Sequence, residues 1–125
     1  MKIPILYEDN HLLVVEKPVN IPVQEDSSGD NDLLTILKND IKIRYQKPGN
    51  VYLGLVHRLD RPVGGVIVFA KTSKAASRLS DVMRRKKFDR EYLAIVRGVP
   101  TKQKGMLEHY LFKDTKRNKV HAVSA

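Results

Sequence analysis

The sequence has 125 residues, a net charge of +9 and no cysteine, so disulfide bonds and metal sites with Cys ligands are excluded. No apolar stretch has the length of a secretory signal or a membrane span, which favours a soluble, cytoplasmic protein. The length fits a single domain covering residues 1–125.

Positive charge is concentrated in the second part of the sequence. Residues 1–50 hold 6 Lys and Arg against 8 Asp and Glu, whereas residues 51–125 hold 17 against 6. A basic region of this kind attracts polyanions, and RNA is the obvious candidate partner. A surface that merely keeps the protein in solution explains the charge equally well.

The first elements are predicted to form a β-hairpin or two adjacent strands. Residues 3–7 and 11–15 form short β-type runs, and the turn-forming stretch 8–10 separates them. The second strand is expected to close around Lys17, which is interpreted as a structural lysine or a solvated turn lysine, with the solvated one favoured. Asn20 follows, and asparagine tolerates a left-handed turn better than most residues with a side chain.

A flexible acidic loop over residues 24–30 precedes the first predicted helix. Asn31 or Asp32 is expected to cap this helix, which ends before residue 47. Its apolar face is formed by Leu33, Leu34, Leu37 and Ile41. We interpret the helix as part of the scaffold, and residues 52–56 as a further strand.

A charged loop that runs into a buried strand is the central feature of the sequence. His57 to Asp60 precede Pro62 and a glycine pair, and residues 66–70 then read as a core strand of β-branched and aromatic side chains. Pro62 stiffens the loop, and Gly64 and Gly65 permit unusual dihedral angles or close approach of another chain to the backbone.

Asp60 is the candidate reactive group of this loop. Because it lies between Arg58 and Arg61, its carboxylate is expected to stay ionised, as a nucleophile or base requires. The alternative is an ordinary turn whose charges are only solvated, and the spacing of the residues alone favours that alternative.

The second predicted helix is capped by Thr72 or Ser73 and ends in a run of cations. Its apolar face consists of Ala75, Ala76, Leu79, Val82 and Met83, and the cations are Arg84, Arg85, Lys86 and Lys87. Basic residues in a last helical turn complement the helix dipole, and contact with phosphate groups is an equally weighted second use.

The remaining sequence predicts three strands. Residues 89–98 read as a long central strand that contains Tyr92, which the pattern alone assigns to the core. Residues 106–112 and 119–123 read as a hairpin joined by the basic loop 113–118, a plausible contact for an RNA backbone. Together the elements predict an α+β fold with a mixed, mainly antiparallel sheet and two helices.

Three stretches resemble one enzyme family. The sequence from His57 to Gly65, HRLDRPVGG, followed by VIVFAK, resembles the signature of the RluA-type RNA pseudouridine synthases, an H-R-L-D loop that runs into an apolar F-A-K strand. Residues 7–9 with 13–18 resemble the opening of that family's catalytic domain. Tyr92 with the following LAIVRG resembles its second motif, in which the Tyr belongs to the active site, and on this basis we favour the site over the core for Tyr92.

The resemblance implies that a uridine in ribosomal RNA or tRNA is isomerised to pseudouridine. The N-glycosidic bond breaks, the uracil turns, and its C5 is joined to the same sugar carbon. Reactant and product are isomers, so no cofactor and no metal are expected. Asp60 takes the position of the essential carboxylate. Attack on the uracil ring, attack on the ribose C1′ and proton removal from C2′ remain open, and all three require the ionised form.

The resemblance also implies roles around Asp60. Tyr92 would stack on the uracil, and Arg58 would enter the RNA in place of the extruded base, with an ion pair to Asp60 as its alternative. His57 is interpreted as a hydrogen-bond partner that braces the loop. The residues expected to contact RNA are His57, Arg58, Arg61, Arg84, Arg85, Lys86 and Lys87.

Two departures from the family pattern matter. Val63 and Gly64 stand where the family commonly has Thr-Ser. The family's third motif, G-R-x-H-Q-I-R, whose Arg pairs with the catalytic carboxylate, has no counterpart here. We therefore expect a catalytic domain truncated at its C-terminal side that is weakly active or inactive alone. A non-catalytic, basic RNA-binding module is the alternative function.

Overall fold

The computed structural model describes residues 2–124, and the chain divides into two compact units, Met1–Arg90 and Glu91–Ala125. Each unit is described by itself below. The single catalytic domain expected over residues 1–125 stays a prediction. No helix in the described part of the chain is both long enough and apolar enough to cross a membrane.

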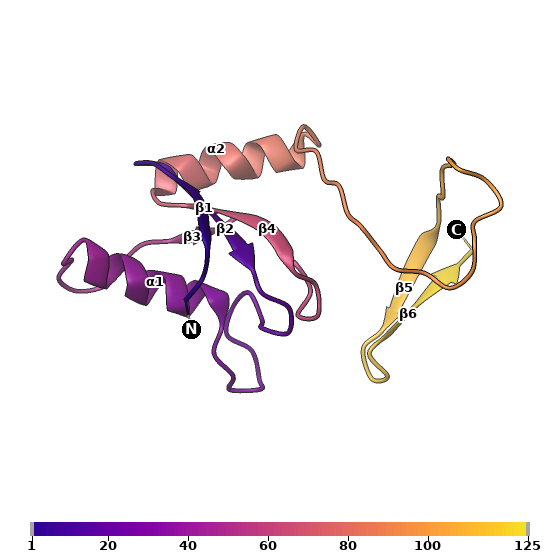
Figure 1. Ribbon diagram of the computed structural model, residues 1–125, viewed down its shortest axis with the longest axis horizontal. Coiled ribbons are helices and arrows are strands. Elements are labelled where there is room, and N and C mark those ends of the chain that lie inside the picture. Colours follow the sequence, from indigo (N-terminus) through magenta and orange to yellow (C-terminus); the bar gives the residue numbers. More distant parts are fainter. Residues whose placement is uncertain (1, 125) are drawn as a thin grey trace. The chain divides into compact units, whose positions relative to one another are not determined.

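The first unit is a four-stranded antiparallel sheet with two helices. Its strands are β1 (Ile5–Glu8), β2 (Leu12–Lys17), β3 (Gly54–Leu55) and β4 (Gly65–Ala70), in the spatial order β1-β2-β4-β3. The helices α1 (Leu33–Arg44) and α2 (Ser73–Arg84) lie on opposite sides of this sheet (Figure 1). The predicted α+β class is confirmed.

The predicted N-terminal hairpin is formed by β1 and β2. Asp9 makes its turn, because Oδ1 of Asp9 accepts hydrogen bonds from the backbone N–H groups of His11 and Leu12, each at 2.7 Å. This side-chain turn is the reason an aspartate is favoured at the position. β2 then runs to Lys17.

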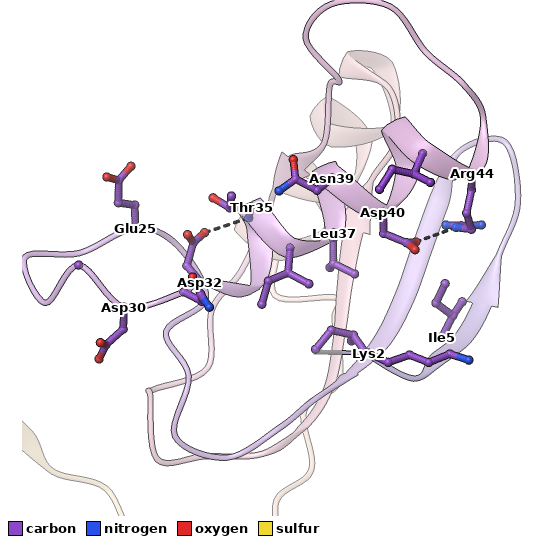
Figure 2. A pocket seen from close by; sticks show the side chains of 15 residues that line it. Lys2, Ile5, Glu25, Asp30, Asp32, Thr35, Leu37, Asn39, Asp40 and Arg44 are labelled. Carbon is purple, nitrogen blue, oxygen red and sulfur yellow. Dashed lines mark hydrogen bonds and ion pairs between the residues drawn. The ribbon is translucent and has the colours of Figure 1, made fainter.

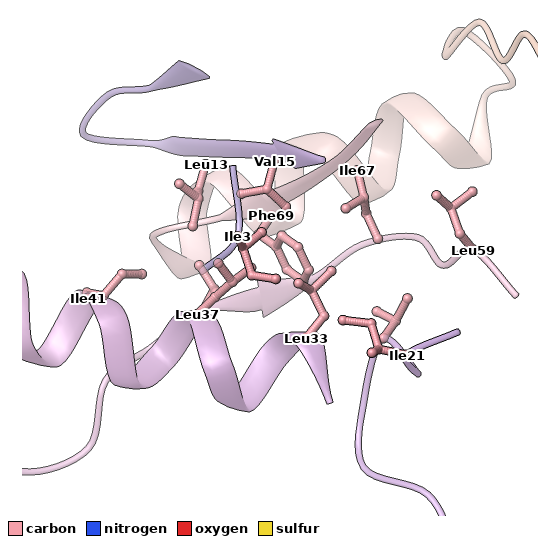
Figure 3. Packing of buried hydrophobic residues seen from close by; sticks show 12 residues of the cluster. Ile3, Leu13, Val15, Ile21, Leu33, Leu37, Ile41, Leu59, Ile67 and Phe69 are labelled. Atoms are coloured by element: carbon pink, nitrogen blue, oxygen red, sulfur yellow. The ribbon is translucent and has the colours of Figure 1, made fainter. Parts of the chain in front are cut away.

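The core lies between the sheet and α1. Leu13 and Val15 of β2 and Ile67 and Phe69 of β4 are all 0% exposed, and Figure 3 shows Leu33, Leu37 and Ile41 of α1 facing them. β4 is also covered on its other face, where Val68 is 8% and Ala70 0% exposed. From Ile67 to Ala70 the strand is therefore buried on both faces, which explains the apolar run there, whereas Val66 is exposed.

Both helices begin at residues that the sequence predicted. Oδ2 of Asp32 accepts a hydrogen bond from the backbone N–H of Thr35 at 3.0 Å, and Oγ1 of Thr72 accepts one from Ala75 at 3.1 Å. Each cap satisfies an amide that has no partner within its own helix. Asp32 and Thr72 are therefore the caps, rather than Asn31 and Ser73.

A polar network around Glu8 ties the end of α1 to the sheet. Its carboxylate accepts hydrogen bonds from Arg44 Nη1 at 2.8 Å, Lys71 Nζ at 2.6 Å and Tyr45 OH at 2.9 Å. Burial disfavours the charged form of Glu8, but the bonds from Lys71, Arg44 and Tyr45 outweigh burial and lower its pKa to about 2.

We expect the stability of the first unit to fall in acid because of Glu8. A carboxyl with a depressed folded-state pKa contributes stability above its unfolded pKa, near 4.5, and loses it as the pH falls towards about 2. Urea unfolding, followed by helix circular dichroism, should show a loss of at most about 3 kcal/mol over this range. Glu8→Gln should flatten the profile, whereas Glu16→Gln on the exposed side of β2 should not. Equal profiles for the two variants would contradict this assignment.

The second unit contains a β-hairpin of β5 (Tyr110–Asp114) and β6 (Lys119–Val123). Oδ1 of Asp114 accepts hydrogen bonds from the N–H groups of Lys116 at 3.1 Å and Arg117 at 3.2 Å, which shapes the turn. The predicted hairpin is confirmed, but its first strand begins at Tyr110 and not at residue 106.

The long strand predicted over residues 89–98 is not formed in the described part of the chain. Leu93 and Ile95 are fully exposed, each at 104% of the reference area. A strand needs a neighbouring strand for its backbone hydrogen bonds, and within residues 91–124 the strands that pair are β5 and β6. The residue pattern of 89–98 is typical of a strand, but no strand within residues 91–124 pairs with it.

Candidate active site

Asp60 begins a tight turn immediately before the central strand. The backbone N–H of Val63 donates to the carbonyl oxygen of Asp60 at 2.9 Å, which closes the turn over Arg61 and Pro62. Leu59, only 9% exposed, anchors the chain before the turn, whereas Asp60 itself is exposed. The loop-to-strand arrangement predicted from the sequence is confirmed, because β4 follows at Gly65.

Lys17 holds the turn from inside the unit. Its ammonium group donates to three carbonyl oxygens, those of Val63 at 2.7 Å, Arg61 at 3.0 Å and Pro18 at 3.0 Å. The side chain is 1% exposed. Burial lowers the pKa of Lys17 and the charge of Arg61 lowers it further, while the charge of Asp60 raises it. Lys17 is therefore structural, and its interpretation as a solvated lysine is wrong.

The turn is also packed against the segment that follows β2. The N–H of Asn20 donates to the carbonyl oxygen of Arg61 at 2.8 Å, and Asn20 has the expected left-handed conformation, with φ of 70°. A Cβ atom at Gly64 would lie 3.0 Å from Cγ1 of Val19 and 3.2 Å from the carbonyl oxygen of Lys17. Gly64 thus lies close to the segment 17–19 of the same chain, and the unusual dihedral angle predicted for the glycine pair is present at Gly65, with φ of 144°.

Neither arginine beside Asp60 forms an ion pair with it in residues 2–124. Arg61 instead binds Asp30, with 2.5 Å between Nη2 and Oδ2, and Arg58 is exposed. The alternative in which Arg58 is an ion-pair partner of Asp60 is therefore not formed in the described chain. The Asp60 carboxylate is left open to solvent at a turn whose backbone is fixed.

His57 braces the strand beside the turn. Its Nε2 accepts a hydrogen bond from the backbone N–H of Val68 at 3.1 Å, so Nε2 carries no proton and the ring is neutral. The ring contacts that of Phe88, with 5.4 Å between centroids. Burial lowers the pKa of His57, and the charge of Arg90 lowers it further. This geometry matches the bracing role expected for His57, and its contact with RNA stays a prediction.

The cationic run after α2 is partly neutralised. Asp81 forms ion pairs with Arg84 and Arg85, and the hydrogen bond from Arg85 is the main cause of the lowered pKa of Asp81. Lys86 and Lys87 are exposed, and α2 has ended before them, at Arg84. The helix dipole therefore accounts for Arg84 better than for the two lysines, which leaves phosphate contact as their predicted use.

Tyr92 belongs to the other unit, Glu91–Ala125, and its side chain is 61% exposed. It is therefore not a core residue of the described unit. Its part in the active site stays a prediction.

A pocket lies beside α1, and its lining includes acidic and apolar side chains (Figure 2). Its lining includes Glu25, Asp30, Asp32 and Asp40 but not Asp60. The acidic lining makes it a poor site for a polyanion. Within residues 2–124, no three His, Asp or Glu side chains are grouped as ligands for a metal ion.

Lys17 is the functional-site residue that the sequence reasoning misjudged, although a signal was present. Leu13, Val15 and Lys17 alternate along β2, and side chains at alternate positions share one face of a strand. The face that buries Leu13 and Val15 therefore also buries Lys17. A lysine in phase with a core face needs acceptors inside the fold, and the carbonyls of the Asp60 turn are those acceptors.

Known proteins are similar to this chain in sequence and in fold. Residues 11–124 match the family model described as RNA pseudouridylate synthase. The chain is 37% identical over 116 residues to Ribosomal large subunit pseudouridine synthase C of Buchnera aphidicola subsp. Baizongia pistaciae, covering 92% of this chain and 35% of that protein. It is 39% identical over 94 residues to the protein of the same name from Escherichia coli K12, covering 75% and 28%.

A solved structure is also similar. Human RNA Pseudouridylate Synthase Domain Containing 4 matches with a TM-score of 0.57 and 28% identity, over 67% of this chain and 30% of that one. The chain thus spans about a third of the length of the proteins it matches. Since the family model covers residues 11–124, which include the Asp60 turn, the chain belongs to the RNA pseudouridylate synthase family.

Proposed function

We propose that this chain belongs to an RNA pseudouridine synthase that isomerises a specific uridine of ribosomal RNA. Asp60 is its essential carboxylate. The family and the names of the relatives, which specify the large ribosomal subunit, support this substrate class. A tRNA target is the second possibility within the same activity. We also propose that the protein is cytoplasmic. Because the reaction is an isomerisation, we expect it to need neither a metal nor a small-molecule cofactor.

The observation that carries the proposal is that the Asp60 carboxylate is exposed on a turn whose backbone is fixed. An exposed carboxylate stands on a turn of which two carbonyl groups, those of Arg61 and Val63, are bound by buried Lys17. A reacting group held on a fixed backbone loses little conformational freedom when it meets a substrate. An ionised oxygen at this place is equipped to attack the uracil ring or the ribose C1′, or to remove the C2′ proton.

The exposed basic side chains support RNA as the partner, because they are able to contact it. In this proposal the uridine is extruded from the RNA stack, and Arg58 fills the gap with its planar guanidinium group. Tyr92 stacks on the extruded uracil. Arg61, Arg84, Arg85, Lys86 and Lys87 contact phosphate groups, and their exposure in the first unit supports this use, Arg61 being half-buried.

A test uses ribosomal RNA carrying tritium at C5 of uridine, because isomerisation releases that hydrogen. The chain is compared with a chimera in which it replaces the matching segment of the Escherichia coli relative. We expect the chimera to release tritium. The chain alone, in which no arginine is ion-paired with Asp60 within residues 2–124, should be at least about 100-fold slower or inactive.

The outcomes separate the alternatives. A folded chimera that binds RNA and releases no tritium would contradict catalysis and favour the non-catalytic RNA-binding module, which predicts only salt-sensitive binding. Release by the 125-residue chain at the rate of the intact relative would contradict the expectation of an incomplete catalytic domain.

A further inference from the structure

We propose that the Asp30 carboxylate binds the guanidinium group of Arg61 in the free protein. An RNA phosphate then binds Arg61 only by displacing the Asp30 carboxylate. This inference rests on the proposed function and adds a residue that tunes RNA binding. It is carried by the contacts of Arg61, the structure of the acidic loop and the exposure of the pair.

The backbone and the side chain of Arg61 are held very differently. Its carbonyl oxygen accepts hydrogen bonds from Asn20 N at 2.8 Å and Lys17 Nζ at 3.0 Å. Its guanidinium group instead reaches the acidic loop, with 2.5 Å from Nη2 to Asp30 Oδ2 and 3.4 Å from Nη1 to Ser28 Oγ. The backbone position is therefore fixed, whereas the charged end depends on a single ion pair.

That ion pair is at the surface. The side chains of Arg61 and Asp30 are 37% and 54% exposed, and exposed ion pairs contribute little to stability because water competes with them. A guanidinium group binds a carboxylate and a phosphate with the same planar donor geometry. A phosphate of the RNA, which carries the proposed substrate, is therefore able to replace the Asp30 carboxylate on Arg61.

The loop that carries Asp30 is built to release it. Residues 25–31 are all exposed, and the loop is anchored to the core only at its ends, by Val23 and Asp32. Its own bonds are local: Asp26 Oδ1 accepts from Ser28 N at 2.9 Å, and Asp30 N donates to Ser28 Oγ at 3.2 Å. Because residues 25–31 are already exposed, moving Asp30 away from Arg61 exposes no buried side chain of the loop itself.

The same loop offers a matched control. Glu25 carries the same charge as Asp30, forms no ion pair in the described residues, and points in the opposite direction from the loop in Figure 2. Neutralising Glu25 changes the long-range field of the loop by one charge and leaves the Arg61 contact in place.

The experiment measures RNA binding by the whole chain at several salt concentrations. We expect Asp30→Asn to tighten binding by about 3- to 5-fold at low salt, the range that one exposed ion pair supports. Glu25→Gln should change binding by less. In an Arg61→Gln background, Asp30→Asn should give no more than the change seen with Glu25→Gln, because no guanidinium group is left to release.

Equal gains from Asp30→Asn and Glu25→Gln would overturn the inference and leave the proposed function in place. An unchanged Asp30→Asn gain in the Arg61→Gln background would overturn it in the same way. Absence of RNA binding by the wild-type chain and by every variant would overturn both. Thermal unfolding of each variant checks that the fold is retained.

Discussion

Asp60→Asn should reduce the rate of tritium release from uridine-labelled ribosomal RNA by about 10²–10⁴-fold. We expect this reduction in the chimera, and also in the 125-residue chain if that chain has residual activity. Asparagine has nearly the same shape as aspartate, but its amide neither ionises nor accepts a proton. The three possible roles of the carboxylate all fail in this variant, so the expectation does not depend on the mechanism.

The same variant should leave folding and RNA binding nearly intact. Asp60 is exposed, and in residues 2–124 its carboxylate forms no ion pair whose loss would destabilise the turn. The unfolding midpoint should match that of the wild type, and RNA affinity should not weaken, because a negative charge is removed. Loss of catalysis with retained binding therefore identifies a reacting group.

Asp89→Asn is the matched control for Asp60→Asn. Asp89 belongs to the same unit and is also exposed, so the variant makes the same chemical change at a residue outside the turn. Its activity should stay close to that of the wild type. Comparable activity of Asp60→Asn and Asp89→Asn would contradict the assignment of Asp60.

Lys17→Met should destabilise the first unit by about 2–4 kcal/mol. Methionine fills a similar volume, but it leaves the carbonyl oxygens of Pro18, Arg61 and Val63 without the donor that now reaches them at 2.7–3.0 Å. Unfolding in urea, followed by circular dichroism, reports this unit, because both helices lie within residues 1–90. The urea midpoint should fall by the corresponding amount.

Lys42→Met distinguishes this effect from the general loss of a lysine. Lys42 is exposed on α1, and its replacement should leave the midpoint nearly unchanged. In the chimera, Lys17→Met should also lower the rate of tritium release under conditions where the protein remains folded, because the turn that carries Asp60 is released. Equal midpoints for the two variants would refute the role of Lys17.

Local signals in the sequence were sufficient for most elements of the first unit. Asp9, Asp32 and Thr72 bond to backbone amides two or three residues away, so their turns and caps depend only on neighbouring residues. The apolar run of β4 likewise predicts burial on both faces. The single strand that failed, over residues 89–98, depends on a distant partner, and no local pattern specifies one.

The sequence by itself determined the α+β class, the family and the position of Asp60 on a loop before a core strand, because these follow from contiguous residues. Only the tertiary structure decided what surrounds Asp60. Lys17 lies 44 residues before Arg61 in the chain and Asp30 lies 31 residues before it, yet both contact it. The packing of β2 beside β4 and the return of the acidic loop create these contacts, so the structure reassigned Lys17 to the interior and Arg61 to Asp30.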